Sequence, residues 1–599
     1  MLSKTRPRIL LLTQRMGDIE TRLQPQLHIM ARIRKIEIRN FRGIKECSWF
    51  PSPGINCLIG PGDSCKSSIL DAIEFCIGAR RTLQITDADF HRLDVEKPIE
   101  VILTIGELTD ALKSIEGYGL YVRSFDPATG EIDDEPEVHH EIVLSVKLAV
   151  ASDLEPVWTL VSDRAEAQGQ SRNLNWPDRV RLAPTRIGVF ADYHLAWSRG
   201  SVLNRISEER ADASAALAKA ARDARQAFGD DAQAQLAQTL QIVETTAAAL
   251  GIEVGSNIRA MLDAHSVSFS GGTISLHSEA GIPLRGLGTG SARLLIAGLQ
   301  RKAAAESTIL LVDETEHGLE PHRIVRFLHS LGAKEPSPPL QVFMTTHSPV
   351  VVRELSGSQL CVVRKQGESH KVLATGTADD IQSTVRLYPE ALLARRIIVC
   401  EGASEVGFVR GIDQFRSSAG QTSINAAGVA LVDCGGGDAD RCFQRALTFS
   451  RLGYETAVVR DSDLKPTASL EEAYAATGGK VTSWRDGRRL EQELFYSVSD
   501  ACVAKLIDYA IELHGEELLI AHTASASNGR TSLAAIRDEL AAGELSDTNR
   551  VILGTASSQR KAGWYKSITW MEHVGRNIAG PDLEYADSGF VALIERIFT

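Results

Sequence analysis

The hydrophobic and polar positions of the chain predict an α/β fold. Residues 31–39 (ARIRKIEIR) alternate apolar and charged side chains, which is typical of a half-buried strand. Residues 55–59 (INCLI) are nearly all apolar, as in a buried central strand. A loop with two glycines follows, and residues 67–77 then have helical spacing. Strand, loop and helix in this order predict one unit of an α/β domain.

Further apolar runs extend this first region. Two strands at 99–105 and 140–150 predict an antiparallel sheet added to the α/β unit. A helix is expected at 292–305. The remaining predicted strands of this region are 267–276, 308–312 and 341–345.

A second α/β pattern begins after residue 395. Its expected strands lie at 396–400, 429–432 and 456–459, and each is short and apolar. Residues 375–394 are interpreted as the connection between the two regions. The sequence therefore predicts two successive α/β domains.

Residues 206–250 differ in composition from both regions. They are rich in Ala, Gln and Arg, contain no Pro, and have a single Gly at 229, a composition that favours helix. We interpret them as two helices folded into a hairpin. The pair either packs on its own domain or protrudes as a dimerisation arm, and we favour the arm.

Composition narrows the class of protein. The chain has 599 residues, 43% of them hydrophobic and 24% charged, with a net charge of −12. These values indicate a globular protein that does not hold nucleic acid by overall charge, although a local basic groove remains compatible with them. Nine scattered Cys without a CxxC pair indicate the reducing cytoplasm. The sequence has no run of 18 apolar residues that would predict a membrane span.

The loop at 60–67 (GPGDSCKS) has the context of a P-loop, which binds nucleotide phosphates through backbone N–H groups. Lys66 is expected to reach the β- and γ-phosphates, and Ser67 to bind Mg²⁺. Cys65 stands where GxxxxGK[ST] has its second glycine, which leaves open whether the site hydrolyses ATP. The predicted nucleotide-binding residues of this loop are Gly60, Gly62, Ser64, Cys65, Lys66, Ser67 and Ser68.

Downstream motifs support a nucleotide site. Asp313 and Glu314 end an apolar strand, as in a Walker B motif, so Asp313 is expected to hold Mg²⁺ and Glu314 to polarise the attacking water. Gly288, Gly290 and Ser291 precede a helix and resemble the signature loop of ABC-type ATPases. His347 follows the next strand and resembles their switch histidine. This order of motifs resembles the SMC-like branch of those ATPases.

Acidic residues end the strands of the second region. Glu401 and Glu405 follow the strand 396–400, and Asp461 and Asp463 follow the strand 456–459. The C-terminal ends of parallel strands lie at one edge of a sheet, so these carboxylates are expected to converge. Carboxylate oxygens suit Mg²⁺ or Mn²⁺, and two such ions clamp the reacting oxygens in phosphodiester hydrolysis.

The EGxxE and DxD strand ends resemble the TOPRIM pattern. Together with an SMC-like ATPase, they make the chain similar to the overcoming-lysogenization-defect (OLD) family of nucleases, which includes the nuclease subunit of the Gabija antiphage system. The resemblance implies an ATP-binding, metal-dependent DNA endonuclease in antiphage defence, a homodimer, and a helicase-like partner. The implied boundaries are an N-terminal extension (1–29), a split ATPase domain (30–200 and 255–385), a helical dimerisation insert (201–254) and a TOPRIM nuclease domain (390–599).

The resemblance also implies a later acid and a catalytic lysine. Glu491 or Glu493 fits the acid, and we favour Glu491 as a further metal ligand. Lys561 and Lys566 both fit the lysine. Nearby Arg485, Arg488 and Arg489 either contact phosphates or are exposed helix charges.

Two other functions compete with nuclease activity. One is a DNA-clamping ATPase of DNA repair whose TOPRIM domain binds DNA but does not cut it. The other is a strand-passage or primer-synthesis enzyme, which ranks last because the sequence has no obvious Tyr-bearing cleavage domain or zinc module.

Overall fold

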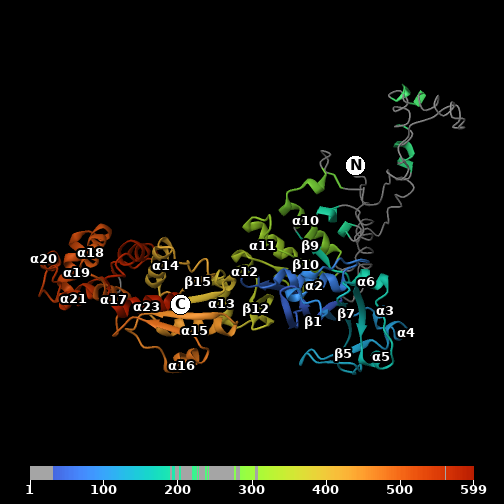
Figure 1. The fold of residues 1–599 in the computed structure, drawn as a ribbon, viewed down its shortest axis with the longest axis horizontal. Helices are drawn as coiled ribbons and strands as arrows, with labels where there is room; N and C mark the ends of the chain where they lie inside the picture. Colours follow the sequence, from blue (N-terminus) through green and yellow to red (C-terminus); the bar gives the residue numbers. More distant parts are fainter. Residues whose placement is uncertain are drawn as a thin grey trace, which may run out of the picture. The chain divides into compact units, whose positions relative to one another are not determined.

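A computed structural model describes residues 31–188, 192–195, 201–203, short pieces between 219 and 241, 276–277, 283–303, 308–559 and 562–599. The chain forms two compact units (Figure 1). The first unit comprises Met1–Asn56 and Ser67–Thr345, and the second comprises Cys57–Lys66 and Thr346–Thr599.

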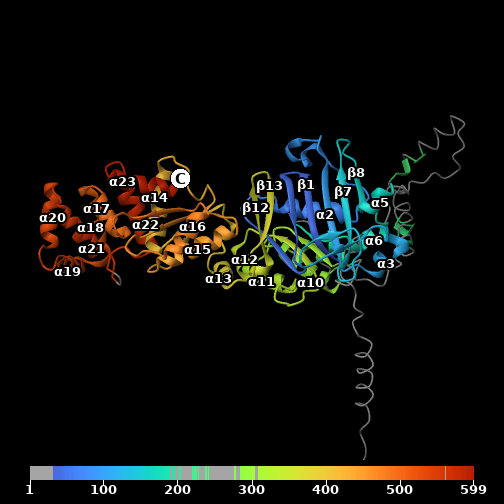
Figure 2. The ribbon, with the colours of Figure 1, turned by 90° about the horizontal axis from the view of Figure 1, so that it is seen from below.

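An antiparallel sheet makes up much of the first unit. Its strands follow the order β6-β5-β7-β4-β1-β2, and β8 also pairs with β7. Figure 2 shows β1, β7 and β8 of this sheet. Apolar residues on one face of β1 are buried, as the alternating sequence predicts. The strands are β1 (Arg32–Phe41), β2 (Ile44–Trp49), β4 (Ile99–Gly106), β5 (Val122–Phe125), β6 (Ile132–Asp133), β7 (Glu141–Val150) and β8 (Pro156–Val161).

Parallel strands form the other part of the first unit. β10 (Ile309–Val312) pairs with β9 (Thr185–Ile187) on one side and with β11 (Gln341–Thr345) on the other. β10 and β11 are buried along their whole length, which explains their continuous apolar sequences. The helices of this unit are α2 (Lys66–Ile77, which begins in the second unit), α3 (Asp110–Lys113), α4 (Ile115–Tyr118), α5 (Asp163–Ala167), α6 (Trp176–Leu182), α10 (Thr289–Lys302) and α11 (Pro321–Ser330).

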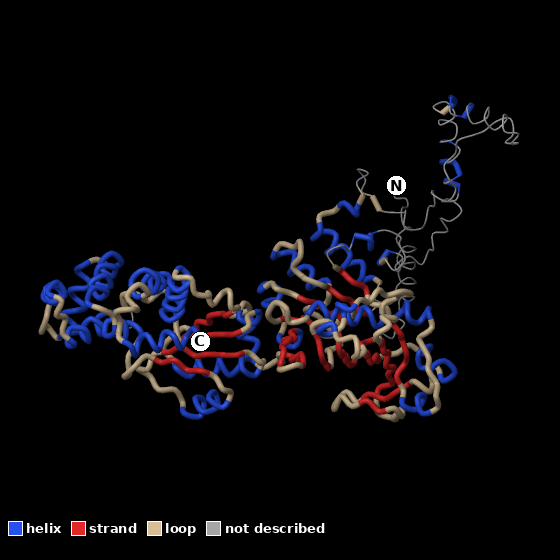
Figure 3. The backbone as a smooth tube through the Cα atoms, viewed as in Figure 1, coloured by secondary structure: helices blue, strands red, loops and turns tan. Residues whose placement is uncertain are grey.

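The second unit contains a four-stranded parallel sheet in the order β15-β14-β16-β17. Helices flank these strands (Figure 3). The strands are β14 (Arg396–Cys400), β15 (Val429–Asp433), β16 (Glu455–Arg460) and β17 (Lys480–Ser483), and the helices that follow the first three are α14 (Ala403–Ser418), α15 (Ala439–Arg451) and α16 (Ala468–Ala476).

Helices complete the second unit after β17. They share one apolar core with β14 and β16, in which Trp484 and Trp564 are the largest fully buried side chains. The helices are α17 (Leu490–Ser497), α18 (Asp500–His514), α19 (Glu516–Ser527), α20 (Leu533–Ala542), α21 (Asp547–Ser557), α22 (Ile568–His573) and α23 (Ser588–Phe598).

A smaller group of strands also belongs to the second unit. The end of β3 (Ile55–Ile59) pairs in parallel with β12 (Leu360–Gln366), which pairs with the antiparallel β13 (Ser369–Ala374). The helices next to them in sequence are α12 (Pro349–Glu354) and α13 (Asp379–Leu387). Residues 375–394, expected to be a connection, thus contain a helix.

Most predicted strands coincide with observed ones to within two residues. The extension 1–29 and the strand predicted at 267–276, apart from Leu276, lie outside the described residues, as does the helical hairpin at 206–250 except for short pieces. Among the described helices, none is long and apolar enough to cross a membrane.

Candidate metal and nucleotide sites

The acidic residues of the second unit meet at one edge of its parallel sheet. Glu401 directly follows β14, and Asp461 directly follows the neighbouring strand β16. The backbone N–H of Asp461 donates a hydrogen bond to Oε2 of Glu401 at 3.0 Å. The N–H of Leu490, at the start of α17, donates to Oδ1 of Asp461 at 3.0 Å. Two strands and one helix therefore hold these carboxylates in place.

Glu401, Asp461 and Asp463 each offer an oxygen atom, and these atoms lie within 4.8 Å of one another. They line a pocket of about 630 Å³. The other lining residues are Gly402, Ala403, Ser404, Glu405, Asp433, Gly435, Gly436, Gly437, Leu464, Arg489, Glu491 and Lys566. The five acids expected to bind metal thus line one pocket, with a guanidinium and an ammonium group.

Burial raises the pKa of several of these acids. Burial is the largest cause of the raised pKa of Glu401, and the nearby charge of Asp463 adds to it. The pKa values of Glu405 and Asp461 lie well above their usual ranges, again through burial first and neighbouring carboxylates second. Crowded, buried carboxylates of this kind are stabilised in their charged form by a cation. An all-oxygen donor set fits Mg²⁺ or Mn²⁺.

The loop after β15 lies against this pocket. Gly435, Gly436 and Gly437 have φ angles of 81°, 72° and 77°, a region that favours glycine. The N–H of Gly436 donates to the backbone carbonyl of Glu401 at 2.7 Å. The three glycines therefore let the backbone pass close to the acidic site.

The P-loop lysine binds to the loop's own oxygens. Nζ of Lys66 donates to the carbonyls of Gly60 at 3.2 Å and Pro61 at 2.7 Å, and to Oγ of Ser64 at 3.2 Å. Burial lowers the pKa of Lys66 to about 8. Gly62 is exposed. The ammonium group is thus held inside the loop by neutral oxygens only.

In the first unit, Ser67 and Asp313 are directly linked. Oγ of Ser67 donates to Oδ1 of Asp313 at 3.0 Å, and Oγ1 of Thr345 donates to the same oxygen at 2.7 Å. Ser68 is half-buried in the first turn of α2. The side chain of Glu314 is 55% exposed. The residues expected to hold and use a nucleotide-bound Mg²⁺ are therefore adjacent.

Two family models match the chain. Residues 55–353 match the model described as "AAA domain, putative AbiEii toxin, Type IV TA system". Residues 392–463 match the model described as "Overcoming lysogenization defect protein-like, TOPRIM domain", and they include Glu401, Glu405, Asp461 and Asp463. The chain is an ATPase–TOPRIM fusion of the OLD type. The expected α/β fold class is confirmed with it, and the two domains support an enzyme of the ATPase or nuclease type.

Several solved structures are similar to this OLD-type fusion. The SMC head domain from Thermotoga maritima is 14% identical with a TM-score of 0.27, covering 57% of this chain and 98% of that chain. The Smc head domain from Pyrococcus furiosus, bound to the C-terminal domain of ScpA, is 14% identical with a TM-score of 0.32, covering 57% and 96%. The recombination mediator protein RecF is 12% identical with a TM-score of 0.29, covering 58% and 99%. The search of curated proteins found no match.

The residues expected to form the signature loop and the switch histidine lie around α10 and after β11. Gly288 precedes α10, and Gly290 and Ser291 lie in its first turn. A Cβ on Gly290 would lie 2.1 Å from the carbonyl oxygen of Gly318, so only glycine fits there. Oγ of Ser291 accepts a hydrogen bond from Arg323 at 2.9 Å. His347 is exposed after β11.

Glu491 and Glu493 have different surroundings in the second unit. Glu491 lines the acidic pocket, where Oγ of Ser404 donates to its Oε1 at 3.5 Å. Glu493 is fully buried and accepts hydrogen bonds from Arg485 at 2.7 Å, Arg488 at 3.2 Å and Ser497 at 2.9 Å. The structure thus places Glu491 with the other acids and Glu493 in an internal ion-pair network.

We expect Glu491→Gln to reduce metal-dependent cleavage without lowering the thermal stability of the protein. Glu493→Gln should instead lower the melting temperature by roughly 6–20 °C, because breaking a buried ion pair costs about 3–5 kcal/mol and each kcal/mol shifts the melting temperature by about 2–4 °C in a domain of about 150–250 residues. Calorimetry and a plasmid-cleavage assay on both variants measure the two effects. A stable, active Glu491→Gln protein would contradict its place among the metal ligands.

The basic residues near the pocket also differ in their partners. Nε of Arg489 donates to Oδ2 of Asp463 at 2.8 Å, and Arg489 lines the pocket, whereas Arg485 and Arg488 pair with Glu493. Lys566 lines the pocket and is exposed. Lys561 lies outside the described residues. Arg489 and Lys566 are therefore the described cations in position to meet a phosphate.

Cys65 occupies an unfavourable backbone conformation. Its φ angle is 64°, in the left-handed region that a side chain with Cβ rarely adopts. The sequence shows that a P-loop glycine is replaced, but only the structure shows that the glycine conformation is kept. The loop is thus built in a strained form.

We expect Cys65→Gly to raise nucleotide affinity severalfold. Glycine adopts this conformation without the backbone strain of roughly 1 kcal/mol or more that it imposes on other residues. Titration with a fluorescent ATP analogue measures the change. Cys65→Ala is the matched control, since it removes the thiol but keeps Cβ. An equal gain in both variants would assign the effect to the thiol and contradict the strain argument.

Several polar residues at these sites were not predicted from the sequence. They are Asp71, Glu74, Arg186 and Thr345 in the first unit, and Asp433 and Ser404 in the second. Thr345 ends the strand after Walker B, so its position relative to that motif was a usable signal. Arg186 lies in a three-residue strand and carries no recognisable motif.

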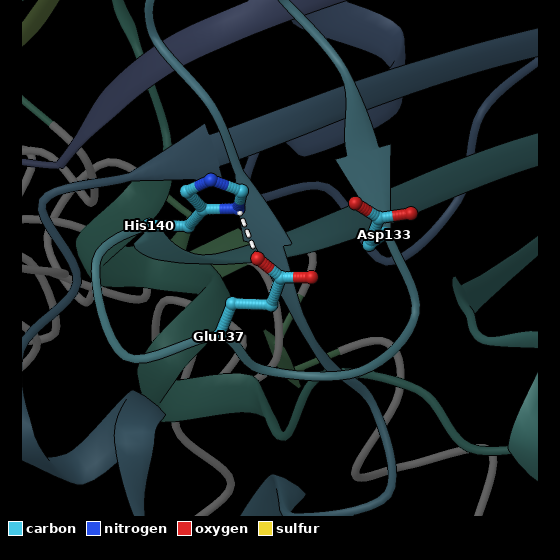
Figure 4. A group of neighbouring side chains, drawn as sticks. All are labelled: Asp133, Glu137 and His140. Atoms are coloured by element: carbon cyan, nitrogen blue, oxygen red, sulfur yellow. Dashed lines mark ion pairs between the residues drawn. The ribbon is translucent and has the colours of Figure 1, made fainter.

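A second group of metal-ligating side chains lies in the first unit. Asp133, at the end of β6, and Glu137 and His140, in the loop before β7, offer atoms within 4.8 Å of one another (Figure 4). Nδ1 of His140 lies 3.3 Å from Oε2 of Glu137, and Asp133 and Glu137 are exposed. We assign this exposed group no function.

Proposed function

We propose that the protein is an ATP-binding, metal-dependent DNA endonuclease that acts in antiphage defence. The convergence of Glu401, Asp461 and Asp463 within 4.8 Å, in a domain of OLD-like TOPRIM type, carries the proposal. Glu405 and Glu491 line the same pocket and complete a set of five carboxylates.

Glu401, Glu405, Asp461, Asp463 and Glu491 would hold Mg²⁺ or Mn²⁺. When bound, such ions activate water and stabilise the leaving oxygen of a phosphodiester. Arg489 and Lys566 line the same pocket and supply positive charge for the non-bridging phosphate oxygens. The Gly435–Gly437 loop, with no side chains, leaves room for a backbone phosphate to approach the acids.

The ATPase domain would regulate cleavage through its nucleotide. Lys66 and the P-loop N–H groups would bind the phosphates, Ser67 and Asp313 would hold Mg²⁺, and Glu314 would orient water. The strained Cys65 favours a site that senses nucleotide over one that turns it over rapidly.

Incubation of the protein with supercoiled plasmid and Mg²⁺ or Mn²⁺, with and without ATP, tests this function. We expect metal-dependent cleavage that is lost with EDTA and changes with ATP. ATP hydrolysis and DNA binding without any cleavage would instead support a DNA-clamping ATPase whose TOPRIM domain only binds.

The partners proposed with this function are DNA, a second copy of the chain and a helicase-like protein, in the cytoplasm. The proposed boundaries remain an ATPase domain at 30–200 and 255–385, a dimerisation insert at 201–254 and a TOPRIM domain at 390–599.

We expect a homodimer in solution, because an SMC-like signature loop acts on the nucleotide of a second subunit. Light scattering at micromolar concentration measures the mass. Replacing 206–250 with a Gly/Ser linker should weaken the dimer, since this segment has apolar residues that an arm must bury. A monomeric full-length protein would contradict the dimer, and an undiminished dimer after replacement would contradict the role of the arm.

A further inference from the structure

A guanidinium group occupies the centre of an acidic cluster beside the Walker B aspartate. Nη2 of Arg186 lies 3.1 Å from Oδ2 of Asp313, and Nη1 lies 2.7 Å from Oε2 of Glu74. Nη1 also contacts Oδ1 of Asp71. β9 pairs with β10, and α2 carries the other two acids, so three elements of the first unit converge on this side chain.

The two oxygens of Asp313 have separate partners. Oδ1 accepts hydrogen bonds from Ser67 and Thr345, while Oδ2 faces Arg186. These partners fix the orientation of the carboxylate. Oδ1 lies against Ser67, and Oδ2 is the oxygen that faces the guanidinium of Arg186.

Among the described residues, Arg186 is the cation that pairs with the side chain of Asp313, whereas the other two acids each have a second cation. Asp71 has a second cation, Arg42, whose Nη1 contacts its Oδ2, but Arg42 also binds Asp89 at 2.9 Å. Glu74 has a second cation in Arg80, whose side chain is 52% exposed. Without Arg186, these three partly buried carboxylates would keep only two cations, Arg42 and Arg80, and the uncompensated negative charge would attract a divalent cation.

We propose that Arg186 is a resident counter-cation of Asp313, a positioning residue that makes metal binding in the ATPase domain depend on nucleotide. The guanidinium offsets the negative charge that Arg42 and Arg80 leave uncompensated, and so keeps a divalent ion from binding beside Asp313 before nucleotide arrives. It also keeps Oδ1 of Asp313 toward Ser67, where a nucleotide-bound ion is needed. This inference rests on the proposed nucleotide site and extends it to the order in which its ligands bind.

The proposal is tested by measuring Mn²⁺ binding to the full chain. Electron paramagnetic resonance reports the concentration of free Mn²⁺. All proteins carry Asp461→Asn and Asp463→Asn, which weaken the TOPRIM site. Without nucleotide, this double variant should bind no Mn²⁺ at Asp313. Adding Asp313→Asn should therefore leave its Mn²⁺ binding unchanged. Adding Arg186→Met should create one further Mn²⁺ site per chain, at least about 10-fold tighter than any background binding, and Asp313→Asn should abolish it.

Two controls separate charge from structure. Arg80→Met removes a cation that also contacts Glu74 but has no contact with Asp313, and it should create no site. Arg186→Lys keeps the positive charge and should also create none. If Arg186→Met does not fold, Arg186→Gln, which keeps hydrogen-bond donors, replaces it with the same expectation.

A nucleotide-free background protein that binds Mn²⁺ through Asp313 would overturn the proposal. So would a folded Arg186→Met or Arg186→Gln protein that gains no Mn²⁺ site. Failure of the parent protein to bind a fluorescent ATP analogue would instead refute the nucleotide site itself. The Mn²⁺ measurements are made without nucleotide, so their result does not depend on that site.

Discussion

Replacing Asp461 with asparagine should reduce metal-dependent DNA cleavage by more than about 100-fold, since even outer partners of metal ligands contribute about 10–100-fold to affinity or activity. Asp461 lies between Glu401 and α17, where it is a member of the three-carboxylate group and accepts the N–H of Leu490. The asparagine side chain keeps an oxygen for that hydrogen bond, so the fold should persist while a charged metal ligand is lost. Initial rates of plasmid nicking at several Mn²⁺ concentrations measure the effect.

Glu472→Gln is the matched control for Asp461→Asn. Glu472 is an exposed acid on α16 of the same domain, and it does not line the pocket. It should cleave plasmid at the parent rate. Full activity of a purified Asp461→Asn protein would exclude this carboxylate cluster as the nuclease centre.

Replacing Lys66 with alanine should weaken ATP binding by about 10–100-fold or more, because a hydrogen bond to a charged group contributes about 1.5–3 kcal/mol. In the absence of nucleotide the ammonium is held by Gly60, Pro61 and Ser64. Its pKa of about 8 reflects burial, and a triphosphate would return it fully to the charged state. Titration with a fluorescent ATP analogue measures the loss.

Lys371→Ala, on the β13 surface of the second unit, controls for removing one positive charge. It should bind ATP like the parent protein. Metal-dependent cleavage without ATP should be retained in Lys66→Ala if the two sites act separately. Unchanged ATP affinity in Lys66→Ala would show that this loop is not the nucleotide site.

The order of the domains could be predicted because the signals were local. A buried strand reveals itself by a short apolar run, and the P-loop, Asp313 and the EGxxE and DxD acids follow such runs directly. Carboxylates at the ends of adjacent parallel strands must lie near one another, so Glu401 and Asp461 could be paired without coordinates.

The choice among neighbouring residues could not be predicted in the same way. Glu491 and Glu493 lie on the same short helix, and the sequence alone does not show which side faces the pocket. The same holds for Arg485, Arg488 and Arg489, of which only Arg489 reaches the acids of the pocket. Side-chain direction on a helix depends on what packs against it, and that is a property of the whole domain.

The sequence by itself determined the α/β class, the ATPase–TOPRIM order and the candidate acids, because periodicity and motif spacing are encoded in consecutive residues. Only the tertiary structure decided that Glu493 is an internal ion-pair partner, that Cys65 keeps a glycine conformation and that Arg186 neutralises Asp313. Arg186 and Asp313 are 127 residues apart, and the pairing of β9 with β10 brings them together. Contacts between such distant residues arise from the packing of strands and helices, which no local pattern records.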